Sequence, residues 1–173
     1  MKITLLPNLT REKAHGVTLE ICKWLDKYGA EYACLDEVHI SFCAMPTMQH
    51  FKFQELIEWC DVIISVGGDG SVLNAARQTV DYKKPILCIN AGTLAFMAGL
   101  ESNELELLKN LIDGDYTIDR RMLLDVSVIR KGQVVMSNSC INDAVLARGG
   151  ALRITDIRSS KLFLNQMNWM FSG

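Results

Sequence analysis

Residues 61–71, which read DVIISVGGDGS, decide the fold of this 173-residue chain. The first half is an almost unbroken run of β-branched residues, typical of a strand buried on both faces of a parallel sheet. The glycine-rich turn Gly67-Gly68-Asp69-Gly70 follows directly. Beyond it, apolar and small side chains recur at helical spacing over residues 71–80. The stretch therefore predicts a buried strand, a tight turn and a helix in direct succession.

The residues before and after this stretch continue the same alternation. Glycine and proline residues separate short apolar runs from amphipathic segments. Strands alternating with helices predict an α/β, Rossmann-like domain with a mostly parallel sheet covered on both faces. We expect strands at residues 2–6, 31–35, 38–42 and 85–90, and helices at residues 10–28, 53–59 and 103–112, the last capped by Asn103.

The pattern changes after about residue 116. Residues 124–130 and 133–137 read as two strands joined by a turn at Lys131-Gly132. We therefore expect an α/β nucleotide- or phosphate-binding domain over residues 1–115 and an incomplete β-rich domain over residues 116–173. The chain stops without a polar tail, so we expect the second domain to be cut short and its exposed edges to favour a homo-oligomer.

Composition excludes several classes of protein. The formal net charge is −2, which argues against nucleic acid as the main partner. None of the six cysteines is three residues from another, so no zinc ligand pair and no dedicated metal site is expected. Free thiols favour a reducing compartment, the cytoplasm. The most apolar stretch is too short and too interrupted for a membrane span.

The glycine turn is the first candidate site. Gly67, Gly68 and Gly70 would let the backbone approach an anion, and the helix N-terminus with Ser71 would help to hold phosphate oxygens. Asp69 adds a negative charge, which suits a base for a hydroxyl that attacks phosphorus, or a cation ligand. The alternative is a structural turn with Asp69 as the helix N-cap. Neither a P-loop nor a G-x-G-x-x-G turn is present.

Two further segments carry polar or aromatic candidates. Asn90 follows a predicted buried strand and could bind a ligand or brace the loop after it. Phe96 could stack on a base or belong to the core. Asn142 and Asp143 could hold ribose hydroxyls or form an Asx turn.

The three segments together, in this order and approximate spacing, resemble the NAD kinases from about residue 61 to the end of the chain. Arg121-Met122-Leu123-Leu124 adds to the resemblance. The resemblance implies transfer of a phosphoryl group from ATP, or polyphosphate, to the 2′-hydroxyl of the adenosine ribose of NAD, giving NADP. It also implies Mg²⁺ at the phosphates, and an α/β domain followed by a β-sandwich-like NAD-binding domain, with the active site between them.

The same resemblance implies a role for each candidate residue. Asp69 matches the general base. Gly67, Gly68, Gly70 and Ser71 match the loop near the phosphates. The remaining matches lie on the NAD side: Asn90 in the second motif, Phe96 near the adenine, Asn142 and Asp143 at ribose and amide groups, and Arg153 as a basic contact or an ordinary surface charge.

The chain departs from the family pattern at several positions. Ser71 replaces Thr, Ala95 replaces Gly, and Asp143 replaces Glu, which shortens the carboxylate by one methylene. The chain also ends before segments that supply much of the family's NAD site, so we expect weak activity or none from it alone. Two alternatives remain: another kinase with this loop, of the phosphofructokinase or lipid kinase type, or a catalytically dead NAD-binding or interaction module.

Overall fold

The computed structural model describes residues 1–42, 45–92, 95–141 and the backbone of 163–171. The chain divides into two compact units, one formed by Met1–Arg120 with Asn168–Gly173 and the other by Arg121–Met167. The expected domains, residues 1–115 and 116–173, stay a prediction. No helix in the described part of the chain is long and apolar enough to cross a membrane.

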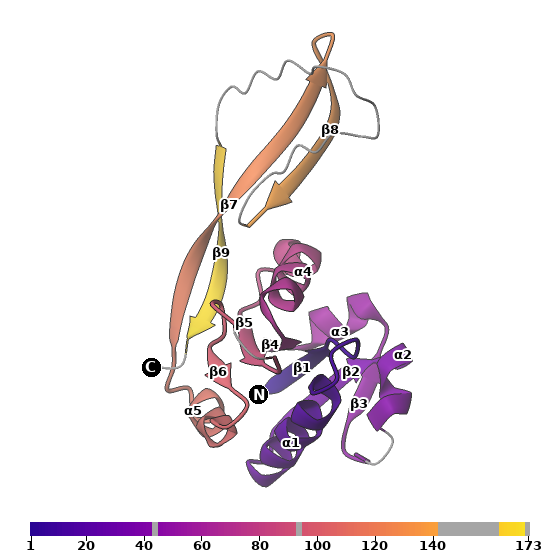
Figure 1. Cartoon of the computed structure of the whole chain (residues 1–173), viewed down its shortest axis with the longest axis vertical. Coiled ribbons are helices and arrows are strands. Elements are labelled where there is room, and N and C mark those ends of the chain that lie inside the picture. The colour runs from indigo at the N-terminus through magenta and orange to yellow at the C-terminus, as the bar shows by residue number, and fades with distance from the viewer. Residues whose placement is uncertain (43–44, 93–94, 142–162, 172–173) are drawn as a thin grey trace. The chain divides into compact units, whose positions relative to one another are not determined.

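The first unit is built on a parallel sheet, which confirms the α/β fold predicted from the sequence (Figure 1). Its strand order is β3-β2-β1-β4-β5, and each neighbouring pair is parallel. Two further strands pair with β5 in parallel, β6 along its end and β9 through Trp169 opposite Ile86. The strands are β1 (Lys2–Pro7), β2 (Glu31–Leu35), β3 (Gln49–Phe51), β4 (Val62–Gly67), β5 (Ile86–Asn90), β6 (Leu100–Glu101) and β9 (Phe163–Phe171).

Helices connect these strands, as parallel pairing requires. The first and fourth are long enough to cover strands, whereas the others are short. The α-helices are α1 (Ala14–Lys27), α2 (Asp36–His39), α3 (Phe53–Trp59), α4 (Asp69–Thr79) and α5 (Leu108–Asp113). Three 3₁₀ turns are the remaining helical elements of the described residues: η1 (Ile40–Phe42), η2 (Val80–Tyr82) and η3 (Leu105–Leu107).

The core lies on both faces of the sheet. On one face, Ile64 and Val66 of β4 belong to the same buried cluster as Ile21 and Leu25 of α1. Side chains that alternate with them along the strands point to the opposite face. There the Thr4 hydroxyl donates a hydrogen bond of 3.2 Å to the Leu56 carbonyl of α3. This double burial explains why β4 is apolar at nearly every position.

The strand order places three chain turns at one edge of the sheet. In parallel sheets, ligands bind beyond the carboxyl ends of the strands, at the point where the strand order reverses. Here that point lies between β1 and β4. The segments that follow β1, β4 and β5 begin at Asn8, Gly68 and Ala91, so the fold gathers them there.

Two sequence-based expectations are wrong. Residues 38–42 form the end of α2 and η1 rather than a strand, because acidic Asp36 and Glu37 begin a helical turn directly after β2. Asn103 does not cap a helix over residues 103–112. The segment begins instead as the 3₁₀ turn η3 and continues as α5, which ends at Gly114 with a φ of 80°.

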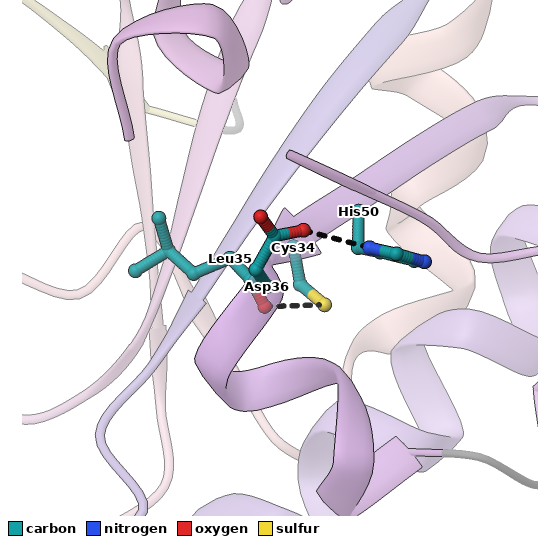
Figure 2. A network of polar contacts seen from close by, with 4 residues as sticks. All are labelled: Cys34, Leu35, Asp36 and His50. Carbon is teal, nitrogen blue, oxygen red and sulfur yellow. Dashed lines mark hydrogen bonds and ion pairs between the residues drawn. The ribbon is translucent and has the colours of Figure 1, made fainter. Parts of the chain in front are cut away.

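The sheet edge at β3 is held by polar contacts (Figure 2). Cys34 of β2 and His50 of β3 are register partners. Asp36 Oδ1 lies 2.7 Å from His50 Nδ1, and both side chains are about half exposed. The Cys34 thiol donates to the Leu35 carbonyl at 3.5 Å. Of these two contacts, the one between Asp36 and His50 ties the three-residue strand β3 to the segment that follows β2.

The second unit contains most of an antiparallel hairpin. Strands β7 (Thr117–Arg130) and β8 (Gln133–Cys140) pair from Leu124 opposite Cys140 to Arg130 opposite Gln133. Lys131 and Gly132 both have positive φ, as a two-residue type I′ turn requires. The strands and the turn expected here are confirmed, and both strands are longer than expected.

Candidate active site

The glycine turn joins β4 directly to α4. Strand β4 ends at Gly67, Gly68 is the helix N-cap, and Asp69 is the first helical residue. The helix thus begins two residues earlier than expected. Asp69 is not the N-cap, and no side-chain hydrogen bond caps this helix. Its carboxylate makes its contacts elsewhere.

Asp69 binds the loop that follows β5. The Phe96 N–H donates to Asp69 Oδ2 at 3.2 Å, and the Met97 N–H donates to Asp69 Oδ1 at 2.9 Å. Each carboxylate oxygen accepts one backbone hydrogen bond and keeps further acceptor capacity. Asp69 therefore brings together two of the segments that the sequence singled out, although they are 27 residues apart.

Gly67 allows helix α4 to begin close to the sheet. A Cβ atom at this position would lie 2.7 Å from the Ser71 Cβ and 3.3 Å from the Asn8 Cβ. A Cβ at Gly68 or Gly70 would meet no atom of the described residues within 4 Å. Packing thus requires glycine at position 67, whereas at positions 68 and 70 none of the residues that the structure describes stands in the way of an approaching group. A phosphate could approach there.

Asn8 is a site residue that the sequence analysis missed. Its Nδ2 donates to the Ser71 Oγ at 2.9 Å, and its Oδ1 accepts from the Thr10 hydroxyl at 2.6 Å. Asn8 lies directly after β1, on the β1 side of the point where strand order reverses. The sequence did contain a signal for this residue, because Asn8 is a polar residue directly after a short apolar strand.

Asn90 is buried, with 2% of its surface exposed. Its Oδ1 accepts from the Gly92 N–H at 2.8 Å, and its Nδ2 donates to Glu101 Oε2 at 2.9 Å. The Ala91 N–H donates to the Gly67 carbonyl at 2.9 Å. The Asn90 amide is thus engaged with the chain on both sides and braces the start of the loop after β5.

Phe96 is at the surface, with 85% of the residue exposed. Its backbone is held by Asp69, so its ring is carried on an anchored segment and is free of the core. Such a ring can stack on a planar ligand. The other NAD-side candidates, Asn142, Asp143 and Arg153, lie outside the described residues.

The electrostatic surroundings are acidic beneath this loop. Burial, together with the charges of Asp69 and Glu101, raises the pKa of the Cys88 thiol to about 12. The thiol therefore stays protonated at neutral pH and does not act as a nucleophile. Among the described residues, no group of three or more His, Cys, Asp or Glu side chains could hold a metal ion.

The arrangement suits transfer of a phosphoryl group to a hydroxyl. It combines a carboxylate that can accept a proton, an open glycine backbone at a helix N-terminus, and an exposed aromatic ring on the adjoining loop. In phosphoryl transfer the protein contributes mainly positioning and charge stabilisation.

Comparison with known proteins gives a consistent family. Residues 3–116 match the model of the ATP-NAD kinase N-terminal domain. An NAD kinase of Acetivibrio thermocellus is 29% identical over 160 residues, which are 92% of this chain and 55% of that protein. An NAD kinase of Desulforamulus reducens is 43% identical over 106 residues, which are 61% of this chain and 37% of that protein.

A solved structure shares the fold. The crystal structure of yeast NADH kinase complexed with NADH aligns with a TM-score of 0.70 at 15% sequence identity, over 82% of this chain and 47% of that one. The chain thus spans about half the length of the relatives that it matches.

Proposed function

This chain belongs to the NAD kinase family, and from that premise we propose that the protein transfers a phosphoryl group from ATP, or polyphosphate, to NAD. The acceptor is the 2′-hydroxyl of the adenosine ribose, and the product is NADP. The observation that carries the proposal is the Asp69 carboxylate, which lies at the end of β4 and binds the Phe96 loop.

In this proposal Asp69 accepts the proton of the ribose hydroxyl as the oxygen attacks phosphorus. The carboxylate keeps acceptor capacity beyond its two backbone hydrogen bonds. Because those bonds fix it against the loop, its position relative to a bound ribose is set before the reaction. The exposed Phe96 ring is the candidate for contact with the adenine.

The open backbone at Gly68 and Gly70 is the candidate for the phosphates, with Ser71 held beside it by Asn8. We include Mg²⁺ as the cofactor. When bound with ATP it would neutralise phosphate charge. The Asp69 carboxylate, which keeps acceptor capacity beyond its two backbone hydrogen bonds, supplies the protein oxygen that would fit a cation carried largely by phosphate and water oxygens.

Membership of the family distinguishes among kinases that share the glycine turn. It favours NAD as acceptor over the sugar or lipid considered from the sequence. The Thr117-Ile118-Asp119 tripeptide, which echoes a phosphofructokinase motif, lies at the start of β7, on a different strand from the turn. The remaining alternative is a module that binds NAD without transferring phosphate.

The test is NADP formation from NAD, ATP and Mg²⁺, with Asp69→Asn compared with the unchanged protein. We expect the substitution to lower turnover by about 10²- to 10⁴-fold, the usual contribution of a general base. Asp81→Asn is the matched control, since it removes a carboxylate from an exposed position in η2. Equal turnover in the unchanged protein and in Asp69→Asn would refute the proposed role of Asp69.

A binding measurement separates the two functions of Asp69. Asparagine has one acceptor oxygen, so Asp69→Asn can keep only one of the two loop hydrogen bonds. If NAD binding is kept while transfer is lost, the defect lies in proton removal. If a form of the protein extended to the length of its relatives binds NAD but forms no NADP, the binding-module alternative replaces the enzyme.

We also propose a cytoplasmic location and self-association. The described cysteines, Cys22, Cys34, Cys60, Cys88 and Cys140, are all free thiols, which fits a reducing compartment. Val134, Val135 and Met136 of β8 are more than half exposed, and such surface favours association. Sedimentation analysis that finds only a monomer would contradict self-association.

A further inference from the structure

Glu101 was not among the residues selected from the sequence. It ends β6 and is the register partner of Asn90 in β5. Its Oε2 accepts the hydrogen bond from Asn90 Nδ2 at 2.9 Å. Asn90 is almost fully buried, whereas Glu101 is an exposed residue. A carboxylate thus reaches from the surface to a buried amide.

This contact determines which way the Asn90 amide points. An asparagine amide can turn so that its oxygen and its NH₂ group exchange places. A carboxylate only accepts hydrogen bonds, so Glu101 selects the orientation in which the NH₂ group faces it. The Asn90 oxygen then faces the Gly92 N–H, from which it accepts at 2.8 Å. In the reverse orientation both contacts would be repulsive.

The amide orientation matters because Gly92 begins the loop that Asp69 holds. The loop leaves β5 at Asn90 and returns as β6, which pairs with β5 again through Leu100 and Glu101. The Asn90–Glu101 hydrogen bond therefore closes the base of the loop. Asp69 binds its middle, at Phe96 and Met97.

We propose that Glu101 is a positioning residue for phosphoryl transfer. It orients Asn90, which fixes the start of the loop, and the loop in turn aligns Asp69 with the bound acceptor. Glu101 itself touches neither substrate. The proposal rests on the proposed function for its catalytic consequence, but its structural part can be tested without any activity.

The first measurement is amide hydrogen exchange in the unchanged protein, Glu101→Ala and Glu101→Gln. We expect the Gly92 amide to exchange at least several-fold faster in Glu101→Ala, because its acceptor is no longer held. The Ile64 and Val66 amides in β4 report global unfolding and should not change. Unaltered exchange at Gly92 in Glu101→Ala would overturn the inference, whatever the activity.

The second measurement is the kinetics of NADP formation. We expect Glu101→Ala to lower kcat/KM for NAD by on the order of tenfold to a hundredfold, the scale of a misplaced reacting group, with the KM for ATP little changed. Glu101→Gln keeps an acceptor oxygen and should recover most of the loss. Glu106→Ala removes an exposed carboxylate nearby and is the matched control.

The outcomes separate the two proposals. Faster exchange at Gly92 with unchanged kinetics would overturn the catalytic part of the inference and leave Glu101 as a structural residue. Absence of NADP formation in a form of the protein extended to the length of its relatives would refute the proposed function, while the exchange experiment would still decide whether Glu101 orients Asn90.

Discussion

Ile63, Ile64 and Ile86 of the parallel sheet are fully buried, whereas Ile129 and Val134 of the β7–β8 hairpin are 63% and 61% exposed. Both regions are strands rich in β-branched residues. The sheet has helices on both faces, so its apolar side chains find partners within the first unit. Among the residues of the second unit that the structure describes, most apolar side chains of the hairpin strands have no such cover, although Leu123 is buried. The same type of apolar residue therefore stabilises the core in the sheet, whereas in the hairpin it forms exposed apolar surface.

The largest effect on stability is expected from a substitution in the core of the sheet. Ile64→Ala should lower the free energy of unfolding by about 2–5 kcal/mol, since it leaves a cavity among buried side chains. Ile129→Ala in β7 should change it by about 0.5 kcal/mol or less. Urea denaturation followed by circular dichroism measures both. Comparable losses in the two variants would show that the hairpin is covered in solution.

A smaller effect is expected from the buried thiols at high pH. Burial, together with the charges of Asp69 and Glu101, raises the pKa of Cys88 to about 12 from an ordinary value of 9.0. A thiol whose pKa is higher in the folded state than in the unfolded state loses its proton first in the unfolded state. It therefore destabilises the folded protein progressively as the pH rises from about 9 toward 12. One thiol then contributes a loss of about 1 kcal/mol between pH 8 and pH 10.

Cys88→Ala tests this contribution through the pH dependence of unfolding. The variant should be less stable at pH 8, but its stability should fall less steeply up to pH 10. Thiol labelling sharpens the comparison between regions, since Cys140 at the end of β8 is partly exposed, whereas Cys22, Cys34, Cys60 and Cys88 are buried. If Cys88→Ala keeps the full slope, the Cys88 thiol is not protected by burial.

The smallest effect on stability is expected at Gly70, where one substitution should change stability and function in opposite directions. Gly70 lies in the first turn of α4, and a Cβ there would meet no atom within 4 Å in the described part of the chain. Gly70→Ala should therefore raise stability by up to about 0.5–1 kcal/mol. NADP formation should fall, because the methyl group would occupy space proposed for phosphate. Thermal unfolding measures the change in stability, and turnover measures the change in NADP formation. Full activity of Gly70→Ala would refute the proposal that phosphate binds at this position.

The sequence predicted the parts of the fold that local patterns determine. Residues 62–66 are β-branched almost throughout because β4 is buried on both faces, so composition alone identifies the strand. Lys131 and Gly132 identified the hairpin turn through their conformational preferences. Residues 38–42 misled because their alternation of apolar and polar side chains also fits a helical turn followed by a 3₁₀ turn.

The candidate site was predicted only where a motif carried it. The glycine turn and the Phe96 segment were found, and the contacts of Asp69 bring them together. Asn8 and Glu101 were missed since each acts through a partner distant in sequence. Glu101 lies in a two-residue strand, which leaves no periodic pattern to detect. Contacts of this kind follow from strand order, which a single sequence does not reveal.

The closed base of the loop after β5 has a thermodynamic consequence. A loop tethered only at its ends loses conformational entropy when a ligand orders it, and that loss weakens binding. Here the Asn90–Glu101 hydrogen bond, the Gly99 N–H bonded to the Cys88 carbonyl, and the Asp69 contacts order much of the loop when the chain folds. The conformational entropy of these residues is thus lost when the chain folds and not when a ligand binds. A ligand at this loop should therefore bind more tightly than it would bind to a loop held only at its ends.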